Sequence, residues 1–266
     1  MKITFLGTGT SQGIPVIGSN HPVCHSDDPR DKRLRVSVLI QWKNNNYVID
    51  CGPDFREQML RTLSRKRNPP QPLPVLNGIL FTHEHADHVA GLDDIRPFVF
   101  RQGDMPFYAH QRVLKTLRER FDYIFTTENR YPGAPSVKAI EVRNNISLKL
   151  SGVEVVPIEV FHGKLQVFGY RFDQIAYLTD VKTIAPAEIE KLKGLDILVI
   201  NALRYEEHPT HLNVEEALEL VSLIKPKRTY FTHISHIMGF HAEVEKQLPE
   251  NVYLAYDGLT LTTDET

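Results

Sequence analysis

Short apolar segments separated by polar turns run along most of the chain, and they predict a fold rich in strands. Ile3–Leu6 and Gly78–Phe81 have the length and composition of buried strands, and the apolar run Leu195–Ile200 indicates a strand covered on both faces. Val36–Trp42 and Tyr47–Cys51 predict a hairpin that turns at residues 43–46. Further strands are expected at Pro106–Ala109, Ala139–Val142, Ser147–Leu150, Val153–Val160, Phe168–Phe172, Ile175–Leu178, Arg228–Phe231 and Val252–Ala255.

Helical spacing of apolar residues marks the segments between these strands. Val113–Phe125 keeps its apolar side chains on one face, and Val214–Ile224 is amphipathic. Other helices are expected at Pro53–Ser64, at Gly91–Arg101 with an interruption at Pro97, at Pro186–Leu192 and at Ala242–Leu248. No Gly/Ser-rich or charged linker divides the chain, so we expect one domain over residues 1–266.

The candidate chemistry lies directly after the strand Gly78–Phe81, where residues 83–88 read His-Glu-His-Ala-Asp-His. Imidazole nitrogens and carboxylate oxygens are ligands of Zn²⁺ and similar divalent ions. Side chains alternate along an extended chain, so His83 and His85 point to one side of it. Asp87 and His88 can reach a second point nearby. One loop can therefore serve two metal ions.

Three further ligand-type residues follow predicted strands at wide intervals along the chain. His162 comes after Val155–Phe161, Asp180 after Ile175–Leu178, and His233 after Thr229–Phe231. Binding and catalytic groups collect where strands end in loops. We therefore add these three residues to the candidate site.

Composition and charge restrict the partners that the protein could have. Apolar residues make up 41% and charged residues 24% of the chain, with a net charge of −2. This balance gives no basic field for a nucleic acid, so we expect a small anionic substrate. Only Cys24 and Cys51 are present, which favours a reducing compartment. No signal peptide or membrane span is evident, and we expect a cytoplasmic protein.

Two loops could be mistaken for binding motifs. Gly7–Gly13 contains three glycines, but their spacing differs from that of a dinucleotide fingerprint and Pro15 opposes the helix that must follow, so we interpret it as a polar turn. Arg65–Pro74 is basic and proline-rich, but no aromatic residues interleave with its charges. We interpret it as a solvated loop.

The His-x-His-x-Asp-His motif and the order of the later ligands resemble those of the metallo-β-lactamase superfamily over nearly the whole chain. The resemblance implies an α/β (α+β) fold, a four-layer αββα sandwich of two mixed sheets with a two-metal site at one edge. It implies that His83, His85 and His162 hold one ion, that Asp87, His88 and His233 hold the other, and that Asp180 bridges them. Zn²⁺ and Mn²⁺ both suit such a set, and the two ions would share a hydroxide that acts as the nucleophile.

A proton donor for the leaving group is the remaining requirement. His211 lies just before the Val214–Ile224 helix, and an imidazole of ordinary pKa can donate a proton near pH 7. We therefore assign catalysis to His211 together with Asp87. A surface histidine at a helix N-terminus is the alternative interpretation, and His208 is expected to face water because Pro209 follows it.

Within the superfamily, the chain is most similar to the phosphoribosyl 1,2-cyclic phosphate phosphodiesterases. The residues that carry this likeness are Gly7-Thr8-Gly9, Gly13, His211-x-Asn213, residues 232–236 (Thr-His-Ile-Ser-His) and Asp257-Gly258. That family also holds a structural zinc through three cysteines and a histidine. Here the corresponding positions are Ser19, His21, Cys24 and His236, with His25 as a substitute, so we expect at most a weak third zinc site.

We expect a phosphodiesterase acting on a small cyclic or linear phosphodiester. A lactone or thioester hydrolase on the same site is one alternative, and a metal-binding member without catalysis is another, although the full ligand set argues against it. A tRNA-processing nuclease is disfavoured because no basic arm is evident. A homodimer is compatible with the sequence.

Overall fold

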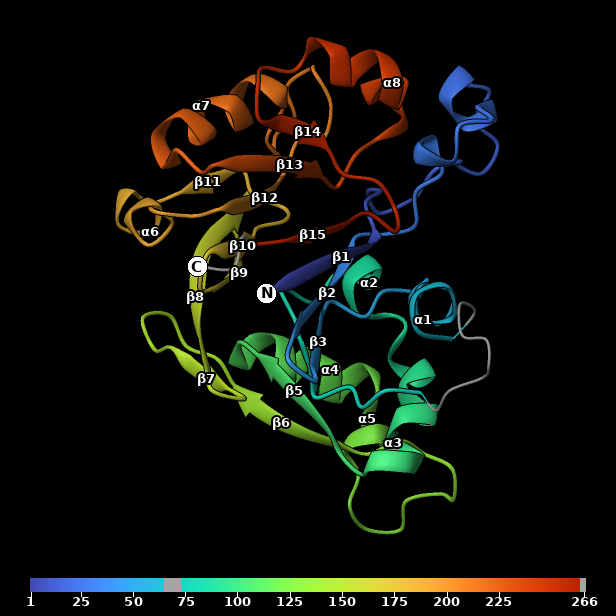
Figure 1. The fold of residues 1–266 in the computed structure, drawn as a ribbon. Coiled ribbons are helices and arrows are strands. Elements are labelled where there is room, and N and C mark those ends of the chain that lie inside the picture. Colours follow the sequence, from blue (N-terminus) through green and yellow to red (C-terminus); the bar gives the residue numbers. More distant parts are fainter. Residues whose placement is uncertain (65–72, 264–266) are drawn as a thin grey trace.

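Two β-sheets lie face to face with helices on both outer sides in a computed structural model of the protein, which describes residues 1–64 and 73–263 (Figure 1). The predicted α/β class and sandwich are confirmed. The first sheet has the order β15-β1-β2-β3-β4-β5-β6. Its strands are β1 (Lys2–Gly7), β2 (Ser37–Trp42), β3 (Asn45–Ile49), β4 (Gly78–Leu80), β5 (Met105–Ala109), β6 (Val137–Glu141) and β15 (Thr260–Thr262).

The second sheet has the order β11-β8-β9-β10-β12-β13-β14, with β7 paired to β8. Its strands are β7 (Leu148–Leu150), β8 (Val153–His162), β9 (Leu165–Phe172), β10 (Ile175–Tyr177), β11 (Thr183–Ile184), β12 (Ile197–Asn201), β13 (Arg228–Thr232) and β14 (Val252–Leu254). Each sheet is antiparallel on one side and parallel on the other: β3 to β6 in the first sheet and β10, β12, β13 and β14 in the second are parallel. The parallel strands of each sheet therefore end at a common edge.

The helices cover the outer faces of the two sheets, with α1 to α5 beside the first sheet and α6 to α8 beside the second (Figure 1). Their bounds are α1 (Phe55–Met59), α2 (Ala86–Val89), α3 (Arg96–Gln102), α4 (Gln111–Arg120), α5 (Asp122–Phe125), α6 (Pro186–Glu190), α7 (Val214–Ile224) and α8 (His241–Val244). Short 3₁₀ turns lie at Pro22–His25, Pro29–Asp31, Leu92–Ile95, His236–Met238 and Glu245–Gln247, and Leu60–Ser64 is a π turn. Among the described residues, no helix is both long enough and apolar enough to span a bilayer.

Three apolar layers hold the sandwich together, and alternate residues of one strand enter different layers. On β12, Ile197 and Val199 belong to the layer between the sheets, whereas Leu198 and Ile200 pack under α7 and its neighbours. The same alternation on β2 sends Val38 inward, while the adjacent Leu39 packs against α1 to α5. Strands covered on both faces are therefore continuous apolar runs, as the sequence of β12 suggested.

Several predicted elements differ in detail from the structure. The helix predicted over Val113–Phe125 is broken at Phe121, whose φ of −130° and ψ of 44° end α4 and precede α5. Pro97 lies in the first turn of α3, where its missing N–H costs no helical hydrogen bond, so it opens a helix and does not interrupt one. The short strands β11 and β15 were not predicted. Most of the loop Arg65–Pro74 lies outside the described residues.

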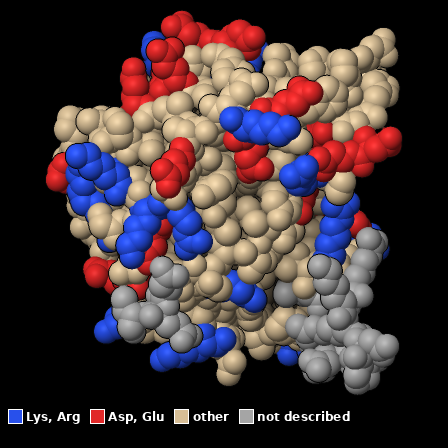
Figure 2. Space-filling model, turned by 45° about the horizontal axis from the view of Figure 1, so that its top comes forward, with Lys and Arg blue, Asp and Glu red and all other residues tan. Residues whose placement is uncertain are grey.

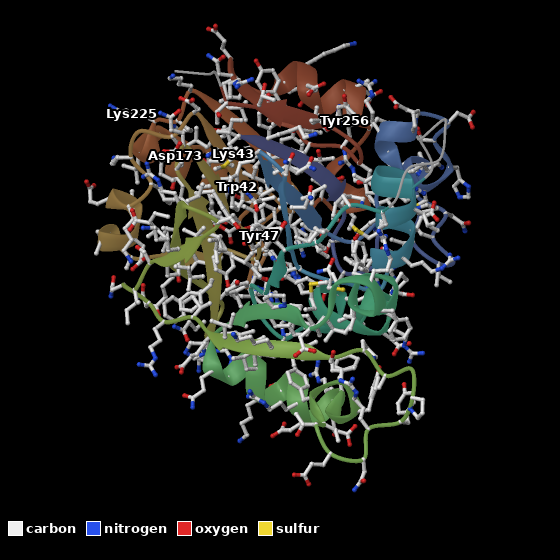
Figure 3. All side chains as sticks on the ribbon, turned by 60° about the horizontal axis from the view of Figure 1, so that its bottom comes forward. Trp42, Lys43, Tyr47, Asp173, Lys225 and Tyr256 are labelled. Atoms are coloured by element: carbon white, nitrogen blue, oxygen red, sulfur yellow. The ribbon has the colours of Figure 1, made fainter. Side chains whose placement is uncertain are left out.

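Two bonds join the sheets directly behind the metal-ligand loop. The hydroxyl of Tyr170 on β9 donates to the carbonyl of Phe81 at 2.7 Å, and the N–H of Phe168 donates to the carbonyl of Thr82 at 3.1 Å. Farther away, Trp42 stacks on Tyr47 with ring centroids 4.9 Å apart, and both lie on the β2–β3 hairpin (Figure 3). The start of the loop that carries His83 is thus fixed to both sheets.

We expect Asn213→Ala to lower the free energy of unfolding by about 1 kcal/mol, the usual contribution of a helix cap. The Asn213 side chain accepts the N–H of Glu216, and the Glu216 carboxylate accepts the N–H of Asn213, which completes a capping box at the start of α7. Urea unfolding measures the change, with Ser222→Ala on the exposed side of α7 as the control. Equal midpoints for Asn213→Ala and the wild type would contradict this prediction.

Candidate metal centre

The seven predicted ligands lie at the ends of strands from both sheets. The loop after β4 carries His83 and His85, and the short helix α2 then carries Asp87 and His88. His162 is the last residue of β8 and does not lie beyond it as predicted. Asp180 follows β10, and His233 follows β13. The ends of β4, β10 and β13 meet because parallel strands of each sheet finish at one edge, and His162 at the end of the antiparallel strand β8 lies beside them.

One predicted ligand set is fully assembled. Asp87, His88 and His233 offer ligand atoms that all lie within 4.8 Å of one another. His88 Nε2 is 3.3 Å and His233 Nε2 is 3.8 Å from Asp87 Oδ2. Asp180 faces the same imidazoles, with Oδ2 3.3 Å from His88 Nε2 and Oδ1 3.3 Å from His233 Nε2. Its two oxygens thus point at different nitrogens, both from the set predicted for one ion, and the bridging role stays a prediction.

The set predicted for the other ion is assembled differently from the expectation. His83 Nε2 and His85 Nδ1 are 3.0 Å apart, close to the separation of two nitrogens on one ion with Zn–N bonds of about 2.0–2.1 Å. His162 lies beside them, with ring centroids 5.3 Å from His85. Among the described residues, however, ligand atoms within 4.8 Å of one another form other groups. His83 groups with His88 and Asp180, and His162 groups with Asp180 and His211. His85 belongs to none of these groups.

Sequence reasoning missed Asp50, which supports the centre from below. Its Oδ2 lies 2.7 Å from His88 Nδ1 and also accepts the hydroxyl of Thr82 at 2.8 Å, while Oδ1 accepts the Thr82 N–H at 2.8 Å. A ligand histidine is held this way in many metal sites, where a carboxylate on the far nitrogen fixes the ring. The available signal was a lone carboxylate at the end of a strand that neighbours β4.

His162 is oriented by a second interaction of the same kind. Its Nδ1 lies 2.7 Å from the carbonyl oxygen of Thr210, which can accept a hydrogen bond from an N–H at that nitrogen. The other ring nitrogen of His162 is therefore the one available to an ion. Thr210 belongs to the segment that also carries His211, so this bond ties the β8 end to that segment.

Left-handed backbone conformations occur at three residues of this centre. Asp50, Asp180 and His233 have φ values of 64°, 57° and 56°. Such conformations are uncommon for residues other than glycine and persist where surrounding structure enforces them. At Asp180 and His233 they turn the chain sharply after a strand and direct the side chain into the site.

The carboxylates and imidazoles of the centre shift each other's pKa values strongly. Burial alone would lower the pKa of His88, but the carboxylates of Asp87, Asp180 and Asp50 outweigh burial and raise this pKa well above its usual value. Burial would raise the pKa of Asp180, yet the His233 and His88 imidazoles hold it well below its usual range. A proton on His88 therefore supplies part of the positive charge that the carboxylates require.

Unpartnered nitrogens provide the test of whether metal ions fit here. His88 Nε2, His211 Nδ1 and both ring nitrogens of His233 are buried without a hydrogen-bond partner. Orphaned buried polar atoms of this kind call for an ion or water. His88 Nε2, His211 Nδ1 and His233 Nε2 face carboxylate oxygens, and nitrogen with oxygen donors suits divalent ions. The residues of this chain thus fit a metal centre.

His211 lies inside the site, which supports its candidacy but corrects its expected pKa. Its ring stacks on His233 with centroids 4.8 Å apart, and its Nδ1 is 3.7 Å from Asp180 Oδ1. Burial and then the charge of His233 lower the pKa of His211 to about 3. The expectation of an ordinary pKa is therefore wrong, since position alone could not reveal burial. His208 is only half-buried, and its ring is tilted against that of His211 with centroids 5.0 Å apart.

The residues proposed for a weak third zinc site are only partly brought together. The rings of His21 and His236 meet edge to face with centroids 5.2 Å apart. Cys24 is buried in a small apolar cluster, where its sulfur accepts the N–H of Val16 at 3.5 Å. The Ser19 hydroxyl accepts the N–H of His21, and His25 is exposed. The third zinc site stays a prediction.

Comparisons with known proteins agree with this geometry. A family model for the beta-lactamase superfamily domain matches residues 45–234. A crystal structure described as a new diphosphatase from the PhnP family is 40% identical, with a TM-score of 0.88 over 99% of this chain and 98% of that chain. An octanoyltransferase of Porphyromonas gingivalis is 39% identical over 267 residues, which are 100% of this chain and 52% of that protein.

A more distant relative is ribonuclease Z of Bacillus subtilis, which is 26% identical over 177 residues, or 65% of this chain and 49% of that protein. The chain therefore spans about half the length of the curated relatives it matches. All seven predicted metal ligands lie inside the matched region 45–234. The protein thus belongs to the beta-lactamase superfamily, with a metallo-hydrolase fold, and within that superfamily to the PhnP family.

Proposed function

We propose that the protein is a two-metal phosphodiesterase that hydrolyses a small cyclic or linear phosphodiester. One observation carries the proposal: buried, unpartnered imidazole nitrogens of His88, His211 and His233 face the carboxylates of Asp87 and Asp180. Two adjacent ions suit phosphoryl transfer because they stabilise both the attacking and the leaving oxygen. The 40% identity to a PhnP-family diphosphatase supports phosphoryl chemistry.

The chain offers a distinct ligand set for each ion. Asp87, His88 and His233 would hold one ion, and His83, His85 and His162 the other. Asp180 would contact both. Nitrogen and oxygen donors without a thiolate suit Zn²⁺ or Mn²⁺. Bound there, two such ions would activate water for attack and neutralise the charge that develops on the phosphoryl group.

His211 would stabilise the oxygen that develops charge during the reaction. Because its pKa is lowered to about 3, the ring is neutral near pH 7 and cannot serve as an imidazolium acid. A neutral imidazole can still donate its N–H as a hydrogen bond, and neutral histidines act as such donors in other enzymes. This role replaces the general-acid role that the sequence suggested.

Surface charge supports a small substrate over a polymer. Lys and Arg side chains alternate with Asp and Glu over the face shown in Figure 2, and neither sign covers it continuously. With a net charge of −2, the chain has no excess of positive charge for a nucleic-acid backbone. We also infer a cytoplasmic location, which the free thiols of Cys24 and Cys51 support.

A thioester or lactone hydrolase is the second candidate, because the octanoyltransferase that matches this chain points to acyl chemistry in a related protein. A substrate panel separates the candidates: bis(p-nitrophenyl) phosphate, a ribose cyclic phosphate, an octanoyl thioester, a lactone and a tRNA precursor. We expect metal-dependent hydrolysis of the phosphodiesters with kcat/KM at least tenfold above that of the acyl substrates. Turnover of the thioester alone, or of the tRNA precursor alone, would overturn the proposal.

We expect two divalent ions per chain in the wild type and fewer in Asp180→Asn. Asparagine tolerates the left-handed φ of 57° at this position but lacks the negative charge. Metal affinity should fall by more than the ~10–100-fold seen for residues that only orient a ligand. Elemental analysis and calorimetric titration measure this, with Asp104→Asn at an exposed position as the control. Unchanged stoichiometry and affinity would show that Asp180 is not a ligand.

We expect His211→Ala to lower kcat by about 10²–10³-fold, the usual effect of removing one donor to a developing oxyanion. The loss should be smaller on a nitrophenyl ester, whose leaving group needs little stabilisation. Because the pKa of His211 is about 3, wild-type kcat should show no fall near pH 6.5 from loss of an imidazolium proton. The exposed His25→Ala variant is the control. An alkaline limb near pH 6.5 that disappears in His211→Ala would restore the general-acid role.

A further inference from the structure

The residue between the first two histidine ligands faces away from the metal centre and is held by α4. Side chains alternate along the extended His83-Glu84-His85 segment, so Glu84 points to the side opposite the two imidazoles. Its carboxylate receives two parallel bonds from Arg112, Nε to Oε1 at 2.9 Å and Nη2 to Oε2 at 3.1 Å. The Glu84 side chain is 14% exposed, so water screens this pair only in part.

The same guanidinium also reaches the second sheet. Arg112 Nη2 donates to the carbonyl of Gln166 at 2.5 Å. Gln166 pairs with Phe161 across the β8–β9 hairpin, next to the pair formed by His162 and Leu165. Arg112 therefore connects the loop of His83 and His85 with the hairpin that ends at His162. These are the three residues proposed for one of the two ions.

A further bond from α4 supports the same loop. Arg120, near the end of the helix, donates from Nη1 to the carbonyl of Glu84 at 2.7 Å. Both ends of α4 thus hold Glu84, once by its carboxylate and once by its backbone. His85 itself is exposed, so the loop around it depends on such bonds for a fixed position.

We propose that Arg112 and Glu84 are positioning residues for one ion only, the ion held by His83, His85 and His162. Metal ligands must be held close to their productive geometry, and this set combines residues from strands of two different sheets. The bidentate pair and the Gln166 bond fix their separation. The inference rests on the proposed two-metal function. It predicts that loss of Arg112 or Glu84 weakens the binding of one ion and not of the other. The other set, Asp87, His88 and His233, is held by Asp50 and by the chain after β13.

The chain offers a matched control pair at the end of β6. Arg143, two residues beyond that strand, donates to Glu141 from Nε and Nη2, both at 3.0 Å, which reproduces the bidentate geometry. The Arg143 side chain is 65% exposed, and the pair carries no metal ligand between its partners. Removing Arg143 therefore removes the same kind of interaction without touching the centre.

The test compares Arg112→Met with Arg143→Met by titrating the metal-free proteins with Zn²⁺ in a calorimeter. We expect two binding steps in the wild type and a weakening of one step in Arg112→Met by about 10–100-fold, as for residues that orient metal ligands. Arg143→Met should change neither step. Glu84→Gln should weaken the same step. The double variant should bind metal in this step as tightly as Arg112→Met does, since both residues act through one interaction.

The outcomes separate this inference from the proposed function. Equal weakening of both steps, or two unchanged steps in Arg112→Met and Glu84→Gln, would overturn the inference, whatever substrate is hydrolysed. If Arg112→Met fails to fold, Glu84→Gln alone decides, because it keeps the shape of the side chain. A wild type that shows two steps but no phosphodiesterase activity would contradict the proposed function and leave the positioning role standing. Fewer than two steps in the wild type would overturn both.

Discussion

A buried carboxylate beneath the ligand loop is the constraint on which the rest of the centre depends. Asp50 is completely buried, and burial raises its pKa, so its negative charge depends on the bonds that it accepts. Those bonds come from the N–H and hydroxyl of Thr82 and from the ring of His88. An uncompensated buried carboxylate would cost several kcal/mol. The interactions that stabilise Asp50 are therefore the ones that fix the loop and orient His88.

The two sheets contribute to the centre in the same way. In each, strands on one side run parallel, and their ends place ligands at a shared edge: β4 carries His83 into the site, and β10 and β13 place Asp180 and His233. The bonds from Tyr170 and Phe168 hold the β4 loop against the opposite sheet. The left-handed residues then redirect the chain soon after a strand, directly after β3 at Asp50 and after β13 at His233, and three residues after β10 at Asp180. Geometry at the centre thus depends on contacts between sheets as much as on the ligands.

Much of this arrangement could be predicted from the sequence, because burial on both faces leaves a continuous apolar run at β12 and the ligand order follows the strand ends. The break at Phe121 could not be predicted, since the apolar stripe continues through a residue whose backbone leaves the helix. The role of Asp50 could not be predicted, because its partner Thr82 is 32 residues away in sequence, after the neighbouring parallel strand β4. The pKa of His211 depends on burial and on His233, which no local pattern encodes.

Because the candidate ligands come from two sheets, the stability of the folded protein would depend on the concentration of free metal. An unfolded chain scatters residues that lie between positions 83 and 233, so ions of the proposed centre would bind the folded form and leave when the sheets separate. Free metal at a hundred times its Kd would add about 2.7 kcal/mol to the free energy of unfolding. If the protein binds the proposed ions, a shortage of metal would let the chain open more often and be degraded sooner, so that its amount would follow the availability of those ions.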